Sequence, residues 1–308
     1  IWLGLVGSEM CIRDSSTDSV FVDSVGNYDF FFAQHPESMK VIELGLDSIA
    51  YNVPWDTVIV QDPFQSWFFV YVAANGGEIW GTRDALRLAK TPKWAVVAKG
   101  FGGSSDIDMD FSKDLNNIYF SHGGGVKRID GLGSIYSASM TSTEFRETAG
   151  WHGGATTATD NTAPTGTTIT NAYSGSVSGI ALNPANADDL LVLRGNIAAR
   201  RSNNATSASP TFTDLSTLTS SSPFSYDAII DRDDEDIIVV GTSSGAFTSD
   251  DGGSSWTYNS EGFEGTPVYE VRQSVRTWEE GNRRPGEIYL GTFGRGIWSS
   301  TTLLGLKD

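Results

Sequence analysis

Three aspartates alternate with apolar residues in the segment "SDIDMDF", which starts at Ser105. Because side chains alternate between the two faces of a β-strand, Asp106, Asp108 and Asp110 would share one face of one strand. Two carboxyl groups that flank a glycosidic bond can hydrolyse it, one of them as the acid. Asp106 is therefore the candidate acid or base of a sugar hydrolase. We favour the alternative interpretation, in which the three carboxylates form a solvated strand face.

A second acidic segment, "DRDDED", starts at Asp231. Hard cations such as Ca²⁺ prefer several carboxylate oxygens, so this segment is a candidate calcium site. The favoured interpretation is a solvated turn between two strands, and no cofactor is expected. The three histidines lie far apart and lack the spacing of a metal site. The candidate metal ligands are Asp231, Asp233, Asp234 and Asp236.

Two segments combine aromatic and polar residues. In "AGWHGG", Trp151 and His152 could form a platform on which a sugar stacks, although a tryptophan in such a loop more often anchors the loop to the core. In "TWEEGNRRP", Trp278 lies among charged residues. This segment is either an exposed recognition loop or a charge cluster at the rim of the fold.

Internal repetition defines the elements that position these residues. Five segments each contain a β-branched or aromatic run, a glycine-containing turn and a second short run, which is the pattern of a β-hairpin. Each is preceded by another alternating run, and most are followed by a fourth. Four short antiparallel strands per repeat predict an all-β fold, a β-propeller of about five to six blades over residues 56–308, with a β-sandwich or β-solenoid as alternatives. The hairpin segments start at Trp67, Asn116, Asp189, Asp236 and Gly286.

The segment "SDDGGSSWTY" has the spacing Ser249-x-Asp251-x-Gly253-x-Ser255-Trp256. It resembles the Asp-box of BNR-repeat propellers, with serine at position 255 where that motif has threonine. The resemblance implies a structural box, in which Asp251 accepts hydrogen bonds from its own turn and Trp256 is buried between sheets. The closing "IYLGTFGRGIWSS" resembles the last blade of sortilin-type and xyloglucanase-type propellers.

Topology predicts which end of the propeller would bind a ligand. We call the four strands of a blade a, b, c and d in chain order. In an up-and-down blade, the a–b and c–d turns lie at one end, and the b–c turns lie at the other. By analogy of fold, we expect a ligand at the b–c end, opposite the Asp-box turn. The b–c turns present Asn75, His122, Asn196, Ser243 and Arg295. We take His122 and Arg295, together with Trp151, His152 and Trp278, as the ligand-binding candidates.

Composition limits the class of partner. The chain has 308 residues and a net charge of −17, which argues against binding to nucleic acid or to anionic lipid. No apolar run is long enough to span a bilayer. Residues 1–15 resemble a translated sequencing adapter, and without Glu9, Arg13 and Asp14 the net charge becomes −16. Their exclusion also removes Cys11, the only cysteine, and with it any disulfide or thiol chemistry.

We therefore expect residues 16–55 to be leader strands or a partial blade, and residues 137–175 to be a long loop or insertion. The leading hypothesis is a secreted, non-catalytic module that binds a glycan or an extracellular protein as a monomer at the cell surface. The alternatives are a glycoside hydrolase resembling xyloglucanases and a propeller resembling photosystem-assembly factors. The last blade shows only three strands, so a C-terminal or N-terminal segment would supply its fourth.

Overall fold

The computed structural model describes residues 59–65, 69–73, 78–83, 95–99, 108–122, 125–141, 143–145, 166–169, 172, 177–195, 198–215 and 223–300. The chain divides into two compact units. The first contains Ile1–Ile107 and Gly131–Gly166, and the second contains Asp108–Asp130 and Thr167–Asp308. Strands dominate the described part of both units, as the repeats predicted.

The first unit contains one antiparallel sheet with the order β1-β2-β3-β4. Helix α4 (Leu132–Ile135) is a single turn, and residues 143–145 form another short helical turn. Beside α4, Arg83 Nη2 donates a hydrogen bond to the carbonyl oxygen of Ala138 over 3.1 Å. The strands are β1 (Ile59–Gln61), β2 (Phe69–Ala73), β3 (Glu78–Thr82) and β4 (Ala95–Lys99).

The second unit contains four antiparallel sheets, each formed by strands consecutive in the sequence. The first two sheets comprise β5 (Met109–Phe111), β6 (Asn117–His122), β7 (Gly125–Asp130) and β8 (Thr167–Ile169), then β9 (Gly179–Asn183), β10 (Asn186–Arg194), β11 (Ala198–Ser202) and β12 (Thr213–Asp214). The last two comprise β13 (Ser225–Ile230), β14 (Ile238–Thr242), β15 (Gly245–Ser249) and β16 (Thr257–Tyr258), then β17 (Val268–Gln273), β18 (Ile288–Thr292) and β19 (Gly296–Ser300).

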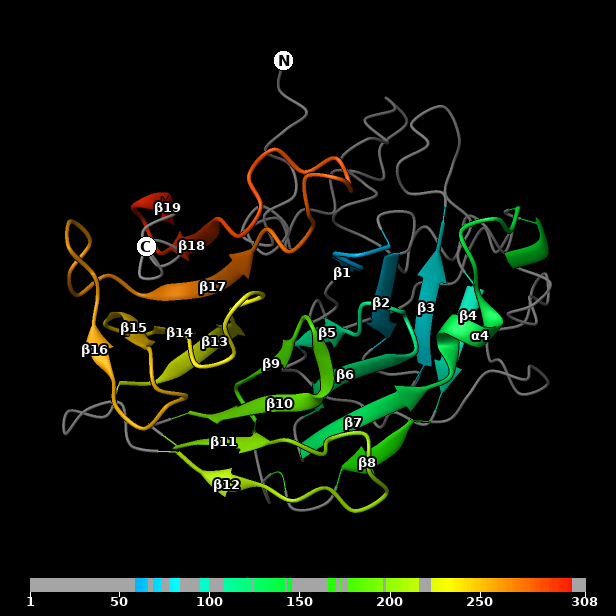
Figure 1. Ribbon diagram of the computed structural model, residues 1–308, viewed down its shortest axis with the longest axis horizontal. Helices are drawn as coiled ribbons and strands as arrows, with labels where there is room; N and C mark the ends of the chain where they lie inside the picture. Colours follow the sequence, from blue (N-terminus) through cyan, green and yellow to red (C-terminus); the bar gives the residue numbers. More distant parts are fainter. Residues whose placement is uncertain are drawn as a thin grey trace, which may run out of the picture. The chain divides into compact units, whose positions relative to one another are not determined.

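The strand order confirms the predicted all-β propeller. In every sheet each strand pairs with its neighbour in sequence, so each sheet is an up-and-down blade. In the second unit, the first strands β5, β9, β13 and β17 lie inward and the last strands lie at the rim (Figure 1). All five segments predicted as hairpins form paired second and third strands.

Two details refine the predicted blades. Strand β8 lies within residues 137–175, the segment predicted as an insertion, and forms the fourth strand beside β7. In the sheet that ends with β19, no fourth strand occurs among the described residues. The C-terminal and N-terminal segments considered for that strand lie outside the described residues.

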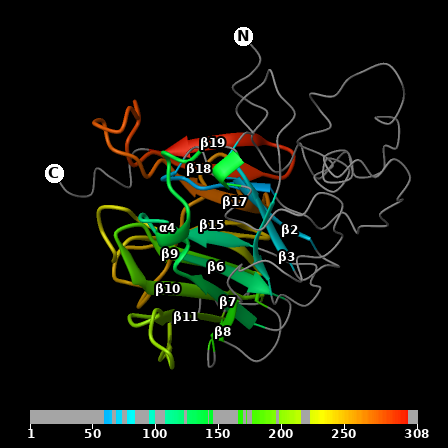
Figure 2. The ribbon, with the colours of Figure 1, turned by 90° about the vertical axis from the view of Figure 1, so that its right-hand side faces the viewer.

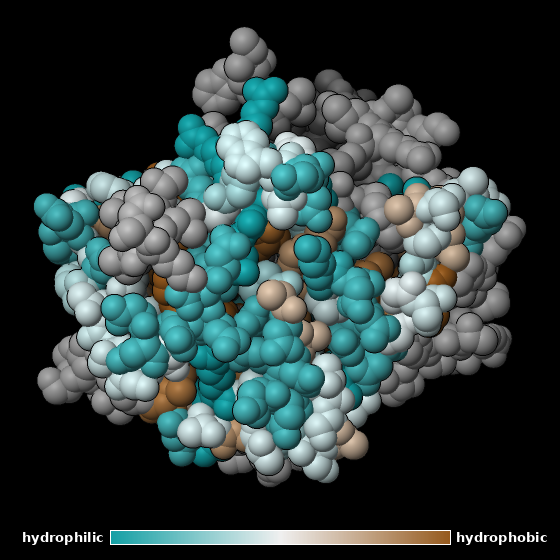
Figure 3. Space-filling model, in the orientation of Figure 1, coloured by the Kyte–Doolittle hydropathy of each residue, from teal (hydrophilic) through white to brown (hydrophobic). Residues whose placement is uncertain are grey.

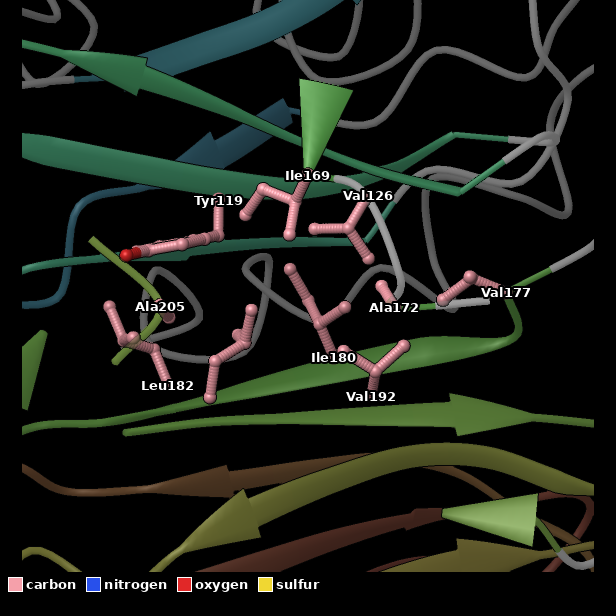
Figure 4. Packing of buried hydrophobic residues seen from close by; sticks show 10 residues of the cluster. Tyr119, Val126, Ile169, Ala172, Val177, Ile180, Leu182, Val192 and Ala205 are labelled. Carbon is pink, nitrogen blue, oxygen red and sulfur yellow. The ribbon is translucent and has the colours of Figure 1, made fainter. Parts of the chain in front are cut away.

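Successive sheets of the second unit are stacked along the chain (Figure 2). Apolar side chains pack between them. Strand β9 shows how one strand serves two interfaces. Ile180 and Leu182 pack towards the sheet that contains β6 and β7 (Figure 4), whereas Ala181 packs towards the sheet that contains β13 and β14. Because both faces are buried, such strands are almost continuously apolar instead of alternating with polar residues.

Two glycines allow neighbouring blades to approach closely. A Cβ atom on Gly179 would lie 2.7 Å from the carbonyl oxygen of Tyr226 on the next blade. A Cβ atom on Gly241 would likewise lie 2.7 Å from the carbonyl oxygen of Val268. Both contacts are with backbone atoms, which cannot move aside as a flexible side chain can. Gly179 therefore sets how closely β9 approaches β13, and Gly241 sets how closely β14 approaches β17.

We predict that Gly241→Ala lowers the free energy of unfolding by about 1–3 kcal/mol, because the added methyl group would force β14 away from β17. Gly291 is the matched control. It occupies the same position in the following sheet, and its Cβ atom would meet mainly the Cβ atom of Glu270, at 3.1 Å. Urea denaturation measures both variants. Equal losses for the two would contradict the predicted steric conflict between blades.

Candidate functional site

Acidic residues occupy the same position on three of the four inner strands of the second unit. Asp227 pairs with Gly241, and Glu270 pairs with Gly291, each next to a bulge in the strand. Asp108 exchanges hydrogen bonds with Ser121, which stands at the corresponding position of β6. On the remaining inner strand this position is Gly179, which pairs with Leu193.

These carboxylates join successive blades. Asp108 Oδ2 accepts a hydrogen bond from the amide nitrogen of Ile180 over 2.9 Å, and Asp227 Oδ2 accepts one from Val271 over 2.7 Å. Ile180 and Val271 each follow the corresponding position of the next inner strand, so the two bonds are equivalent in the repeat. Asp110 Oδ2 adds a third such bond, from the amide nitrogen of Leu182 over 2.7 Å.

Arg272 is the cation of this cluster. Its Nη2 atom lies 2.6 Å from Oε1 of Glu270 and 3.9 Å from Oδ1 of Asp108, and its Nη1 atom lies 3.3 Å from Oδ2 of Asp227. One guanidinium thus faces carboxylates from three inner strands. We call Asp108, Asp110, Asp227, Glu270 and Arg272 the central charge cluster.

Burial shifts the protonation of two members of the cluster. Burial, reinforced by the neighbouring charge of Asp108, raises the pKa of Asp110 to about 7, although Arg272 and the Leu182 amide oppose the shift. Burial also raises the pKa of Asp227 well above its usual range, against the opposing charge of Arg272. Four carboxyl groups share one cation, so the cluster favours retention of protons near neutral pH.

The turn that contains Asp251 is closed by its own side chains. Asp251 Oδ1 accepts hydrogen bonds from the Ser249 hydroxyl and the Ser255 amide, both over 2.8 Å, and Oδ2 accepts one from the Ser255 hydroxyl over 2.6 Å. The amide of Gly253 donates to the Ser249 hydroxyl over 2.8 Å. Trp256 packs against the apolar cluster between the second and third sheets of this unit.

A row of aromatic rings lies where β13 and β17 begin. Ring centroids are 5.1 Å apart between Phe224 and Tyr226, 4.5 Å between Tyr226 and Tyr269, and 5.9 Å between Tyr269 and Phe293. Phe224 packs over Gly195, because a Cβ atom there would lie 2.9 Å from its ring. Phe224 is 41% exposed and Phe293 is 65% exposed. We call these four side chains the aromatic row.

The candidate calcium ligands do not form a cation site. Asp231 is buried, and its Oδ1 atom accepts hydrogen bonds from the amides of Asp233 and Asp234. Its Oδ2 atom accepts a hydrogen bond from the side-chain amide of Gln273. Within the described ranges, no group of three or more His, Cys, Asp or Glu side chains could hold a metal ion. Asp231 instead orders its turn, and Asp236 lies at the end of that turn.

The predicted ligand-binding residues that the structure describes lie in different turns and strands of the second unit. Arg295 is exposed in the turn between β18 and β19, where its Nη1 atom donates to the carbonyl oxygen of Gly262 over 3.3 Å. Trp278 is 65% exposed in the turn between β17 and β18, at the other end of the blade. His122 ends β6. Asp106, Trp151 and His152 lie outside the described residues, as do Asn75 and Asn196.

Sequence reasoning selected the strand that carries Asp108 and Asp110 but missed Asp227, Glu270 and Arg272. An alignment of the repeats would have found two of them, because "SYDA" and "VYEV" place an acid directly after a tyrosine at the start of an inner strand. The same alignment would have found Tyr226 and Tyr269 of the aromatic row. The contacts that join these residues cross between blades, which the spacing within a repeat does not show.

Comparisons with known proteins find a likeness in overall fold only. No protein-family model and no curated protein matches the chain. A solved ancestral GH74 enzyme is similar at 13% identity and a TM-score of 0.43, covering 79% of this chain and 31% of its own. The β-propeller domain of Cps50 (Swd1) from Myceliophteria thermophila is similar at 12% identity and a TM-score of 0.49, covering 79% and 64%.

The GH74 xyloglucanase from Xanthomonas campestris is similar at 17% identity and a TM-score of 0.40, covering 65% of this chain and 30% of its own. The chain therefore spans less than two thirds of the length of each of these structures. These likenesses concern the β-propeller fold and say nothing about activity. Within the described residues, no helix has the length and apolar composition that crossing a bilayer requires.

The raised pKa of Asp110 predicts a pH dependence of stability. Between about pH 4 and pH 7 the folded chain holds a proton on Asp110 that the unfolded chain has released, so the free energy of unfolding falls as the pH rises through this window. We expect Asp110→Asn to flatten that dependence. Urea denaturation at pH 4, 5, 6 and 7 measures it, and an unchanged slope in the variant would contradict the assignment.

The pH dependence of stability that Asp251 predicts has the opposite sign to that of Asp110. Hydrogen bonds from Ser255 and Ser249 lower the pKa of Asp251 to about 2, so its contribution to stability is present above pH 4 and is lost as the pH falls towards 2. Asp251→Ala should lower the unfolding midpoint at pH 7 and lose this acid dependence. Asp250→Ala, a change in the neighbouring residue, is the matched control. Thermal denaturation at pH 7 and pH 3 compares them, and identical midpoints would refute the structural role of Asp251.

Proposed function

We propose that the chain is a non-catalytic β-propeller that acts as a binding module of an extracellular protein. The supporting observation is that Asp108, Asp110 and Asp227 each accept an amide hydrogen bond from the neighbouring blade. A carboxylate that is held by an amide of the neighbouring strand is poorly suited to move into contact with a substrate. The carboxylates of the central charge cluster therefore have a structural explanation that requires no reaction.

The Asp-box resemblance supports the same proposal. Asp251 directs its carboxylate oxygens to Ser249 and Ser255 of its own turn. In this reading the box stabilises the corner of a blade, and ligand contacts belong to the opposite end. The absence of cysteine beyond Cys11 and the acidic composition accord with a secreted module that binds a glycan or protein as a monomer.

A glycoside hydrolase is the second candidate, and one observation favours it. A carboxyl group that acts as the general acid in sugar hydrolysis needs a raised pKa, and the pKa of Asp110 is raised to about 7 beside the charged Asp108. Against it, Asp110 Oδ2 already accepts the Leu182 amide. Asp106, the residue first considered for this role, lies on the same predicted strand face outside the described residues.

One assay separates the two candidates. The full chain is incubated with a panel of β-glucans and polyuronates, and reducing ends and retention are measured in parallel. We expect retention of a polysaccharide without release of reducing ends. Release that is abolished by Asp110→Asn or Asp106→Asn, in variants that keep the wild-type thermal midpoint, would establish the hydrolase instead.

A further inference from the structure

Among the described residues, two of the five exposed large hydrophobic side chains, Phe224 and Phe293, belong to the aromatic row. Its outer rings belong to Phe224, before β13, and Phe293, in the turn between β18 and β19. The half-buried tyrosines between them bring hydroxyl groups to the middle of the row. Burial, followed by the adjacent hydroxyl of Tyr269, raises the pKa of Tyr226 above its usual range.

The row is narrow. Two phenylalanines at these exposures offer on the order of 200 Å² of apolar surface. A stable interface with a globular protein buries about 800 Å² on each partner. Hydrophilic residues cover much of the face shown in Figure 3. A single extended chain therefore fits the row better than a folded partner does.

Charge is distributed unevenly between the two ends of the blades. The a–b connections of β13–β14 and β17–β18, residues 231–237 and 274–287, contain eight acidic residues in a chain with 38 in total. The corresponding b–c connections, residues 195–197, 243–244 and 293–295, contain none. Glu261 and Glu264 are the acidic residues of the described link between β16 and β17, and the Glu264 carboxylate accepts the Gly262 amide.

Near each end of the row, the sequence has an exposed arginine within two residues of a position that belongs to the row or contacts it. Arg194 is exposed and directly precedes Gly195, over which Phe224 packs. Arg295 is exposed two residues after Phe293. Hydrogen bonds from the amides of Glu264 and Gly262 lower the pKa of Glu264, and the charge of Arg295 adds to this shift. The planar guanidinium group binds a carboxylate through two parallel hydrogen bonds, and it keeps its charge at any physiological pH.

We infer that the aromatic row, with Arg194 and Arg295, binds a single chain of an acidic polysaccharide, a polyuronate. Sugar rings place their apolar C–H faces on Phe224 and Phe293, where the negative face of each aromatic ring attracts the weakly positive hydrogens. The tyrosine hydroxyls bond to sugar hydroxyls, and the arginines bind uronate carboxylates. This inference rests on the proposed function and adds to it a site and a class of ligand.

Affinity electrophoresis of the full chain tests the inference, with polygalacturonate in the gel and its fully methyl-esterified, uncharged form as the matched ligand. We expect tighter retention by the acid form. Phe293→Ala should weaken retention about tenfold, as loss of an aromatic contact at a binding centre does. Arg295→Gln should remove most of the preference for the acid form. Trp278→Ala is the matched control, because Trp278 is equally exposed at the other end of the blade.

The outcomes separate this inference from the proposed function. Equal retention by the two polymers, no retention by either, or an equal loss in Trp278→Ala and Phe293→Ala would overturn the inference. Release of reducing ends from the polymers would overturn the proposed function instead. Thermal denaturation of each variant confirms that a loss of retention does not reflect unfolding.

Discussion

Hydrogen bonds from carboxylates to backbone amides across the inner strands hold the second unit together. Asp108 and Asp227 make the same bond at equivalent positions two blades apart, and Asp110 adds another. A carboxylate that is removed from water requires strong hydrogen-bond donors. A backbone amide of the neighbouring blade is such a donor, and it cannot rotate away as a side chain can. The apolar clusters between sheets are non-directional, so these bonds are what fixes the register of one blade against the next.

The same arrangement concentrates negative charge where the inner strands converge. Arg272 is shared among Glu270, Asp227 and Asp108. Burial, with the neighbouring negative charges, raises the pKa values of Asp110 and Asp227 despite the charge of Arg272. A raised pKa is often a sign of an active site, but structural clusters produce it too. Here the hydrogen bonds between blades account for the positions of the carboxylates, and the binding surface that we infer lies at the aromatic row.

Much of the fold could be predicted from the sequence, because each blade is a local structure. The hairpins depend on turns and alternating runs within about fifteen residues, and the turn at Asp251 is closed by residues 249–255. The central charge cluster and the aromatic row depend instead on residues that are distant in sequence, such as Tyr226 and Tyr269. Their association follows from how sheets stack, which no single repeat encodes.

Gly179 makes the inner strand of its blade different from the inner strands of the neighbouring blades. Where β5 and β13 carry an aspartate, β9 has no side chain, and the backbone of β13 occupies the space that a Cβ atom would need. A copy of one blade could not replace another without either a steric conflict or the loss of a cross-strand bond. Each blade is therefore fitted to its own place in the order, although all of them share one strand pattern.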